Sequence, residues 1–450
     1  LSAPPRPKPE QRSFRSRAVD AKVAEVTAAL RAKGRDKLAL MFENCFPNTL
    51  DTTVRNLAKP GQYSTFLVTG DIEAMWLRDS SAQVWPYLRF LKKDHDLRIL
   101  VKTLLVRQFG YICQDPYANA FKADAKGPSE HASDGTLMLP GVFERKWELD
   151  SLAYPICLAY GYWKASGDSG IIDGKWRQTL KTILETYRRE QRKGGLKATK
   201  YTFSRCTSFF NDNVTERGFG WPSKPCGMIV STHRPSDDGQ VFSYFIPGNL
   251  LVADVLGKAA EMECRAGDPE GLSKECLALK AEIESGVRAH GIAEHPKYGR
   301  IYVFEADGYG NRLFMDDANV PSLLGLPYFS EVKRGDPVYE ATRRFVLSED
   351  NPYFAKGTAG EGVGGPHTGH GRIWPMSVIM RALTSDDDAE IRRCLDILVS
   401  SDAGTGFMHE SFDKDNAAVY SRAWFAWANT LFGELVLKLA DRGFFDRKKD

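Results

Sequence analysis

The stretch Ser231–Asn249 (STHRPSDDGQVFSYFIPGN) combines residue types that could do chemistry together. It places two adjacent carboxylates, Asp237 and Asp238, close to Arg234. Successive side chains of an extended segment point to opposite sides. One aspartate could therefore face a pocket while the other holds Arg234 or a backbone turn, and either could be the reactive one.

Two distant stretches carry similar chemistry, and we interpret all three as meeting at one pocket. In Gly406–Phe412 (GFMHESF), Glu410 lies between His409 and a serine. In Thr69–Ser80 (TGDIEAMWLRDS), an arginine that pairs with one carboxylate would leave another free to bind hydroxyls. The alternative for the second stretch is a buried Arg–Asp pair that only ties the loop to the core. The candidate substrate-binding residues of Thr69–Ser80 are Asp71, Trp76, Arg78 and Asp79.

Two further stretches are candidates for the pocket wall. Glu144 and Asp150 lie in ERKWELDS, where helical spacing could present several polar groups together, although surface salt bridges are the alternative. Glu361–His370 (EGVGGPHTGH) is glycine-rich but lacks the Lys and Ser of a phosphate-binding loop. We therefore expect a flexible pocket wall in which His367 or His370 contacts substrate.

Two carboxylates with aromatic and hydroxyl-binding neighbours are what cleavage of a glycosidic bond needs. One carboxylic acid protonates the leaving oxygen, and one carboxylate activates water. Tryptophan faces suit the C–H side of a sugar ring, while Arg, Asp and His side chains bind its hydroxyls. The residues therefore indicate a carbohydrate enzyme, with Asp237, Asp238 and Glu410 as the candidate catalytic groups.

Composition is that of an ordinary globular protein with one to three domains. The chain has 450 residues, of which 42% are hydrophobic and 26% charged. A net charge of +3 is too small to indicate a nucleic-acid partner. No apolar run approaches the roughly 18–20 residues that span a bilayer. We expect no membrane segment, and a monomer.

Cysteine usage argues against a metal site and indicates no cofactor. The eight cysteines are scattered, without C-x-x-C or His/Cys ligand spacing. Cys206 and Cys226 flank a loop that a disulfide could close. Cys157 and Cys276 fall on apolar helix faces, which favours buried free thiols.

Residues 1–12 are predicted to be a flexible tail. The chain starts at Leu1 rather than Met, and LSAPPRPKPE is similar to a segment that follows a cleaved signal. This leaves the compartment open, with a secreted or periplasmic protein favoured over a cytoplasmic one. The sequon Asn213–Thr215 would matter in a secreted protein.

Helical periodicity dominates the rest of the chain and predicts about ten to twelve helices in pairs. The clearest strand-like stretch is Arg300–Phe304. No change in composition marks a linker, so we expect one all-α domain over residues 13–450. Helical hairpins closed in a ring would place the long polar loops at one end, where they could carry the site.

Four motifs occur in order: TGDIEAMWLRDSSAQVWPYL, FERKWELDSLAYP, RPSDDGQVFSYFIPGN and MHESF. From about Lys37 to Phe432 the chain resembles glycoside hydrolase family 125, the metal-independent exo-α-1,6-mannosidases. The resemblance implies an (α/α)6 barrel, an inverting mechanism and a mannose-containing oligosaccharide or N-glycan as substrate. It also implies that Glu410 is the general base and that Asp237 or Asp238 is the general acid, with Asp237 preferred.

Alternatives remain on the same fold. The chain could be a glycosidase for a different sugar, or a carbohydrate-binding protein without catalysis. A metal-dependent hydrolase is a further alternative, in which Asp71, Asp79 and Asp316 or Asp317 hold calcium. The full set of candidate substrate-binding residues is Asp71, Trp76, Arg78, Asp79, Glu144, Asp150, Arg234, His367 and His409.

Overall fold

A computed structural model describes residues 6–56 and 64–446. Its α-helices are α1 Arg17–Arg31, α2 Asp36–Cys45, α3 Leu77–Val84, α4 His95–Gln114, α5 Leu149–Ser166, α6 Gly174–Glu190, α7 Thr215–Gly218, α8 Ile246–Arg265, α9 Leu272–His290, α10 Leu326–Phe329, α11 Pro337–Val346, α12 Pro375–Leu383, α13 Asp388–Ser400 and α14 Ala426–Asp441. Only α7 and α10 have fewer than eight residues. The structure is thus mostly helical, as predicted.

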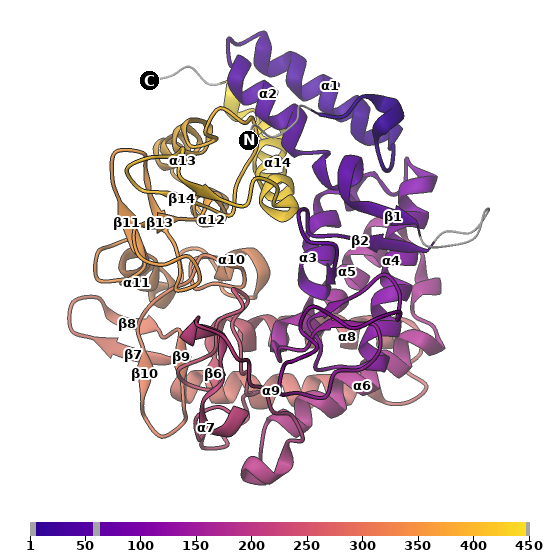
Figure 1. The fold of residues 1–450 in the computed structure, drawn as a ribbon, viewed down its shortest axis with the longest axis vertical. Coiled ribbons are helices and arrows are strands. Elements are labelled where there is room, and N and C mark those ends of the chain that lie inside the picture. The colour runs from indigo at the N-terminus through magenta and orange to yellow at the C-terminus, as the bar shows by residue number, and fades with distance from the viewer. Residues whose placement is uncertain (1–5, 57–63, 447–450) are drawn as a thin grey trace.

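The helices are arranged around a common axis (Figure 1). Six of them form an inner layer: α3, α5, α8, α10, α12 and α14. In that layer α3 packs against α5, α5 against α8, α8 against α10, α12 against α14, and α14 against α3. Outer helices cover them, with α9 on α8, α4 on α5, α13 on α12 and α2 on α14. The last helix therefore returns to the first part of the chain.

Local sequence explains where several helices begin. The Asp173 side chain accepts a hydrogen bond from the Trp176 amide at the start of α6, and Asp387 does the same for Ala389 at the start of α13. Such caps satisfy amide groups that the first turn leaves without partners. Pro247 occupies the first turn of α8, where a missing N–H costs nothing.

Short antiparallel strands precede or connect the inner helices. The strands are β1 Val54–Asn56, β2 Thr65–Leu67, β3 Met75–Trp76, β4 Ala120–Phe121, β5 Val142–Glu144, β6 Tyr244–Phe245, β7 Ile292–His295, β8 Gly299–Tyr302, β9 Glu305–Ala306, β10 Arg312–Leu313, β11 Phe354–Lys356, β12 Glu361–Val363, β13 Arg372–Ile373, β14 Ser411–Asp413 and β15 Tyr420–Ser421. β8 overlaps the strand predicted at Arg300–Phe304. Apart from β7, which is as long as β8, the others have two or three residues, too few to show a period of two in the sequence.

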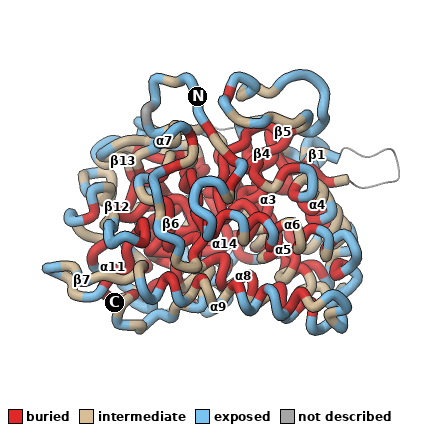
Figure 2. The backbone as a smooth tube through the Cα atoms, turned by 90° about the horizontal axis from the view of Figure 1, so that it is seen from below, coloured by how far each residue is buried: buried red, intermediate tan, exposed pale blue. Residues whose placement is uncertain are grey.

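Three of the small sheets have three strands each, in the orders β3–β4–β5, β10–β9–β6 and β13–β14–β15. Strand β3 leads directly into α3, β6 into α8, and β13 is followed by α12. Figure 2 shows β4, β5 and α7 at one end of the molecule, and α8 and α9 at the other. The sheets thus fasten loops at one end of the helical ring, which is where the polar motifs lie.

The predicted flexible tail at residues 1–12 is only partly covered, because residues 1–5 lie outside the described residues. From Arg6 onward the segment is held by ion pairs. Arg6 contacts Asp51 at 2.7 Å and Asp20 at 2.6 Å, and Arg12 contacts Asp20 at 3.0 Å. These pairs fasten the segment to α1, through Asp20, and to the segment after α2, through Asp51.

The possible disulfide between Cys206 and Cys226 is not formed. Both are free thiols, with Cys206 exposed and Cys226 half-buried. Cys276 is buried as predicted, whereas Cys157 is only half-buried. Burial raises the pKa of the Cys157 thiol to about 11 and that of Cys276 to about 12.

None of the helices in residues 6–56 and 64–446 combines the length and the hydropathy required to cross a bilayer. Within the same ranges, no three or more His, Cys, Asp or Glu side chains are grouped so that they could hold a metal ion. The calcium alternative, which used Asp71, Asp79 and Asp316 or Asp317, therefore has no cluster to support it.

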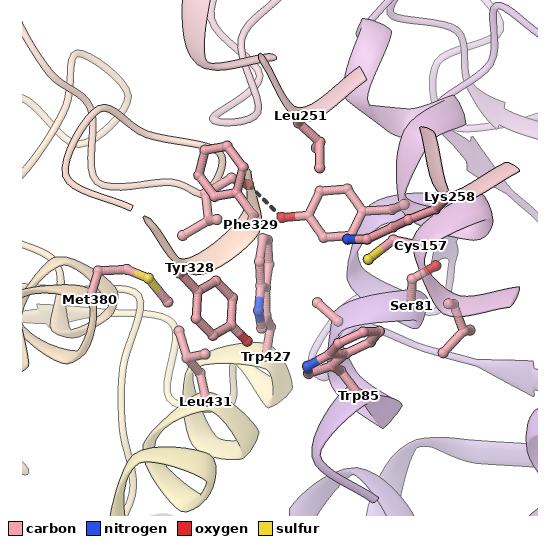
Figure 3. Close-up of a pocket in the computed structure, with 14 residues that line it drawn as sticks. Ser81, Trp85, Cys157, Leu251, Lys258, Tyr328, Phe329, Met380, Trp427 and Leu431 are labelled. Carbon is pink, nitrogen blue, oxygen red and sulfur yellow. Dashed lines mark hydrogen bonds between the residues drawn. The ribbon is translucent and has the colours of Figure 1, made fainter. Parts of the chain in front are cut away.

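The centre of the ring contains an apolar cavity of about 70 Å³ (Figure 3). All six inner helices contribute to its wall. Aromatic side chains from three of them face it, including Tyr154, Tyr328 and Trp427. The Tyr154 hydroxyl donates a hydrogen bond to the Val320 carbonyl at 3.2 Å, which ties α5 to the segment before α10.

Candidate active site

A second, polar pocket of about 50 Å³ lies among the loops. Six of the twelve residues predicted for the site line it: Trp76, Arg78, Asp79, Asp237, His367 and Glu410. The other lining residues are Thr69, Ile72, Pro235, Ser236, Asn319, Trp374, Arg422 and Phe425. Five separate stretches of the chain thus meet at one place, as the sequence predicted for three of them.

Glu410 reaches the pocket from the residue before β14. Its Oε2 accepts a hydrogen bond from the Ser421 hydroxyl at 2.9 Å, and its Oε1 lies 3.7 Å from Arg422 Nη1. Its side chain is only 10% exposed. Both partners fix the orientation of the Glu410 carboxyl group at the pocket.

Arg422 is fixed from several sides. It adopts a left-handed φ of 50°, and its guanidinium lies 4.4 Å from the centroid of the Phe425 ring. Its Nη2 donates to Asp71 Oδ1 at 2.5 Å and its Nε to the same oxygen at 2.9 Å. Asp71, predicted to bind substrate, does not line the pocket; it orients Arg422 beside Glu410 instead.

Asp237 contributes a carboxyl group from another loop. Its φ is 72°, an unusual conformation for a residue with a side chain. The side chain is 29% exposed, and its buried Oδ1 has no hydrogen-bond partner among the described residues. The Lys146 ammonium donates to its backbone carbonyl at 2.9 Å. This carboxyl group is therefore held by its backbone and left available on the pocket side.

The neighbouring carboxylate, Asp238, is turned inward. Its side chain is 4% exposed and does not line the pocket. The Ser236 hydroxyl donates to Asp238 Oδ2 at 3.3 Å, and His367 Nδ1 lies 3.9 Å from Oδ1. The two aspartates thus have different surroundings, but the reason differs from the predicted one, because the chain turns at Asp237 with a φ of 72° and is not an extended segment there.

His367 lines the pocket above Asp238. Burial acts to lower the pKa of His367, but the nearby Asp238, with smaller contributions from the charges of Asp237 and Glu410, raises the pKa to about 9. A protonated imidazole is therefore favoured at neutral pH. It places a positive charge on the pocket wall, opposite several carboxylates.

Arg78 is the centre of a buried charge cluster beneath the pocket. Its Nη1 lies 2.7 Å from Glu148 Oε2 and 3.1 Å from Asp150 Oδ2, and its Nε lies 3.7 Å from Asp79. Burial raises the pKa of Glu148 well above its ordinary range, against the opposing charge of Arg78. Burial likewise raises the pKa values of Asp79 and Asp150, again against Arg78. One cation is therefore shared among three carboxyl groups.

Three other predicted residues bind protein partners behind the pocket wall. Arg234 Nε donates to Glu305 Oε1 at 2.7 Å, with both side chains buried. Glu144 contacts Arg205 at 2.9 Å and Lys146 at 3.5 Å. The predicted substrate contacts of Arg234, Glu144 and Asp150 are thus replaced by ion pairs, because an unpaired buried charge would be costly.

His409 also faces away from the pocket. Its ring stacks on Tyr420 with centroids 3.7 Å apart, and its Nδ1 lies 3.1 Å from the Arg422 carbonyl oxygen. Burial lowers the pKa of His409, which favours the neutral ring. His370, the alternative to His367, stacks on Tyr353 and does not line the pocket.

Sequence reasoning missed four polar groups of the site. Arg422, Lys146 and Ser421 hold the two candidate catalytic segments, and Asn319 lines the pocket with a buried Oδ1 that has no partner among the described residues. Only Lys146 belongs to a stretch that the sequence singled out. The others lie in ordinary-looking loop sequence, so only spatial contact identifies them.

A mostly helical protein in which the carboxyl groups of Asp237 and Glu410 reach one pocket from separate loops fits a glycoside hydrolase. Comparison with known proteins gives the family. The sequence model described as metal-independent α-mannosidase, GH125, matches residues 35–437. This chain belongs to that family.

Individual relatives agree. A Streptococcus pneumoniae structure is described as belonging to a new family of metal-independent α-mannosidases, in a non-productive complex with α-1,6-mannobiose. It is 40% identical, with a TM-score of 0.90, over 97% of this chain and 100% of that one. The meiotically up-regulated gene 157 protein of Schizosaccharomyces pombe is 42% identical over 97% of this chain and 88% of its own length. A wild-type glycosidase at 15% identity, with a TM-score of 0.50 over 94% of this chain and 99% of its own, shares only the fold.

Proposed function

We propose that the protein is an exo-acting α-mannosidase that releases terminal, non-reducing α-1,6-linked mannose with inversion of configuration. Its six inner helices and their outer partners would form an (α/α)6 barrel. Family membership supports mannose as the sugar, and the α-1,6-mannobiose bound by the Streptococcus pneumoniae relative supports the linkage.

One observation carries the proposal: Asp237 and Glu410, 173 residues apart in sequence, line the same pocket. Asp237 has a partly exposed side chain whose Oδ1 accepts no hydrogen bond among the described residues and lies 4.0 Å from Lys146 Nζ. Glu410 is held by Ser421 and Arg422. Two carboxyl groups from separate loops are thus fixed at one pocket, as acid and base catalysis requires.

The reaction uses one water. The Asp237 carboxyl group gives its proton to the glycosidic oxygen as the bond from that oxygen to the anomeric carbon breaks. Glu410 takes a proton from a water molecule whose oxygen bonds to the opposite face of that carbon. Mannose and the shortened glycan leave, and proton exchange with solvent restores both carboxyl groups.

We assign the proton donor to Asp237 rather than Asp238. Asp238 does not line the pocket and is bound to Ser236 beside His367. Asp238 instead favours the protonated form of His367. The protonated ring can donate a hydrogen bond to a sugar hydroxyl, so Asp238 acts on the substrate through His367.

The test is digestion of α-1,6-, α-1,3- and α-1,2-linked mannobiose with the purified protein, followed by proton NMR. We expect hydrolysis of the α-1,6 disaccharide above the others, and β-mannose as the first product. Initial α-mannose would overturn inversion, and preference for another linkage would overturn the α-1,6 assignment. Binding of mannobiose without turnover would favour a carbohydrate-binding protein.

The two aspartates are separated by matched variants. Asp237→Asn should reduce turnover of α-1,6-mannobiose by about 10²–10⁴-fold, the usual contribution of a general acid. Asp238→Asn should mainly raise KM, because it removes the charge that keeps His367 protonated. The reverse pattern would assign proton donation to Asp238.

A further inference from the structure

Lys146 lies outside the pocket but contacts the segment that carries Asp237. It follows β5 by two residues, and its side chain is 2% exposed. Its Nζ lies 2.9 Å from the Asp237 backbone oxygen and 4.0 Å from Asp237 Oδ1. The same ammonium lies 2.9 Å from Asp212 Oδ1 and 3.5 Å from Glu144 Oε1. Two carboxylates therefore fix this cation against the loop of the proposed acid.

The backbone at Asp237 needs such support. A φ of 72° costs free energy for a residue with a side chain and persists only when its surroundings hold it. The Asp237 amide donates to the Arg234 carbonyl at 2.9 Å, and the Gly239 amide donates to the Asn211 carbonyl at 2.6 Å. Lys146 supplies the bond to the Asp237 carbonyl. The turn is thus held on both sides of the aspartate.

We propose that Lys146 is a positioning residue for proton donation: it fixes the Asp237 backbone so that the carboxyl group points at the leaving oxygen. The inference rests on the proposed function, in which Asp237 is the acid. Lys146 does not line the pocket, so it acts through Asp237 and not on the sugar. Asp212 and Glu144 act one step further back, because they hold the ammonium.

The role predicts a particular pattern of loss. An α-1,6-mannobiose leaving group is a sugar alkoxide that needs a proton, whereas 2,4-dinitrophenolate leaves without one. A variant that only misplaces the acid should therefore lose activity on the disaccharide and keep it on 2,4-dinitrophenyl α-mannoside. Damage to the whole site would reduce both rates equally.

The experiment measures kcat and KM of Lys146→Met on both substrates. We expect kcat on mannobiose to fall by about 100-fold, the usual cost of misplacing a catalytic group by about 1 Å. On the dinitrophenyl substrate we expect a loss below about 5-fold, which is smaller than any general-acid contribution. Lys146→Arg, which keeps charge and donors, should recover part of the mannobiose rate.

Arg205→Met is the matched control. Arg205 forms ion pairs with Glu144, Asp134 and Asp212 in the same network. Among the described residues, it forms no ion pair with Asp237. Any loss in this variant should be similar for the two substrates. An equal loss on both substrates in Lys146→Met would overturn the positioning role, as would full mannobiose activity.

A second variant covers the case in which Lys146→Met does not fold. Asp212→Asn keeps the ammonium and removes the charge of one of its anchors. It should therefore lose more activity on mannobiose than on the dinitrophenyl substrate, with a smaller loss than Lys146→Met. An equal fold loss on both substrates would overturn the inference. Failure of the proposed function would look different, because the wild-type protein itself would then hydrolyse neither mannoside.

Discussion

Two cavities use the same helical elements and have opposite chemistry. The active-site pocket contains Arg78 and Asp79 from the first turn of α3, whereas the central cavity contains Ser81 and Ala82 from the same helix. Asn319 lines the pocket, and the next residue, Val320, lines the cavity. The lining therefore changes from polar to mainly apolar within about one turn of α3, and between the adjacent residues Asn319 and Val320.

The difference shows how a helical ring separates reactivity from stability. Polar groups come from helix starts and from loops that small sheets fasten, while apolar groups come from helix interiors. Charges in the pocket are held by other charges, at the cost of desolvation. Side chains around the cavity contribute mainly through the burial of apolar surface. Substitutions in the two regions should consequently give opposite patterns of activity and stability.

Substitution of Glu410 should give the largest difference between the effect on activity and the effect on stability. Glu410→Gln removes the proposed base and should lower kcat on α-1,6-mannobiose by about 10³-fold or more, within the range for acid–base groups. The thermal midpoint should stay close to that of the wild type, because the amide keeps the size of the side chain. Retained activity would contradict the assignment of the base.

Arg78→Met should affect both properties, because the charge cluster belongs to the pocket and to the core. Removal of one partner of a buried ion pair costs about 3–5 kcal/mol, since the other charges are left uncompensated. Glu148 and Asp150 would lose their shared cation. Urea unfolding measures the loss in the free energy of unfolding. An unchanged midpoint would show that the carboxyl groups of the cluster become neutral when Arg78 is removed.

Leu431→Ala tests the apolar side of the comparison. Leu431 is 3% exposed and lines the central cavity (Figure 3). Enlarging the cavity should lower the free energy of unfolding by about 2–5 kcal/mol. We expect kcat below the melting range to be unchanged. A large fall in kcat in the fully folded variant would show that the cavity wall also shapes the pocket.

The smallest effect concerns pH. Because Asp238 raises the pKa of His367 to about 9, the protonated ring adds stability that is complete below the unfolded pKa of about 6.5 and is lost as pH rises through 9. The ring is 35% exposed, so solvent screening limits this contribution to about 1 kcal/mol. The wild type should therefore lose about that much more than His367→Gln between pH 6.5 and 9.5 in urea unfolding. Parallel curves would contradict the pairing.

The sequence predicted a mostly helical protein, and it predicted that the stretches with Asp237 and Glu410 would meet at one pocket, which both residues line. Each lies in a dense polar loop, and such loops gather at one end of a helical ring. Sequence reasoning assigned Arg234 and His409 to substrate because their residue types suited sugar binding. Their actual partners, Glu305 and Tyr420, depend on tertiary contacts that residue type does not reveal.

Arg422 shows the same limit for a residue of the site that the sequence did not predict. Nothing near it in the sequence indicates a role, and its partner Asp71 is 351 residues away. The geometry of the pair sets the position of Glu410, but periodicity and motif spacing carry no information about contacts at that separation. The same holds for Lys146 and Asp212, which are 66 residues apart.

The junction of the two ends of the ring affects when the protein can become active during synthesis. Gly70 forms a β-bridge with Phe425, and the Ala426 amide donates to the Thr69 carbonyl at 3.0 Å. Chains are made from the N-terminus, so a growing chain can contain both proposed catalytic carboxylates before Arg422 exists. Until that residue emerges and meets Asp71, Glu410 lacks its cation. The proposed base would therefore gain its full set of partners only late in translation.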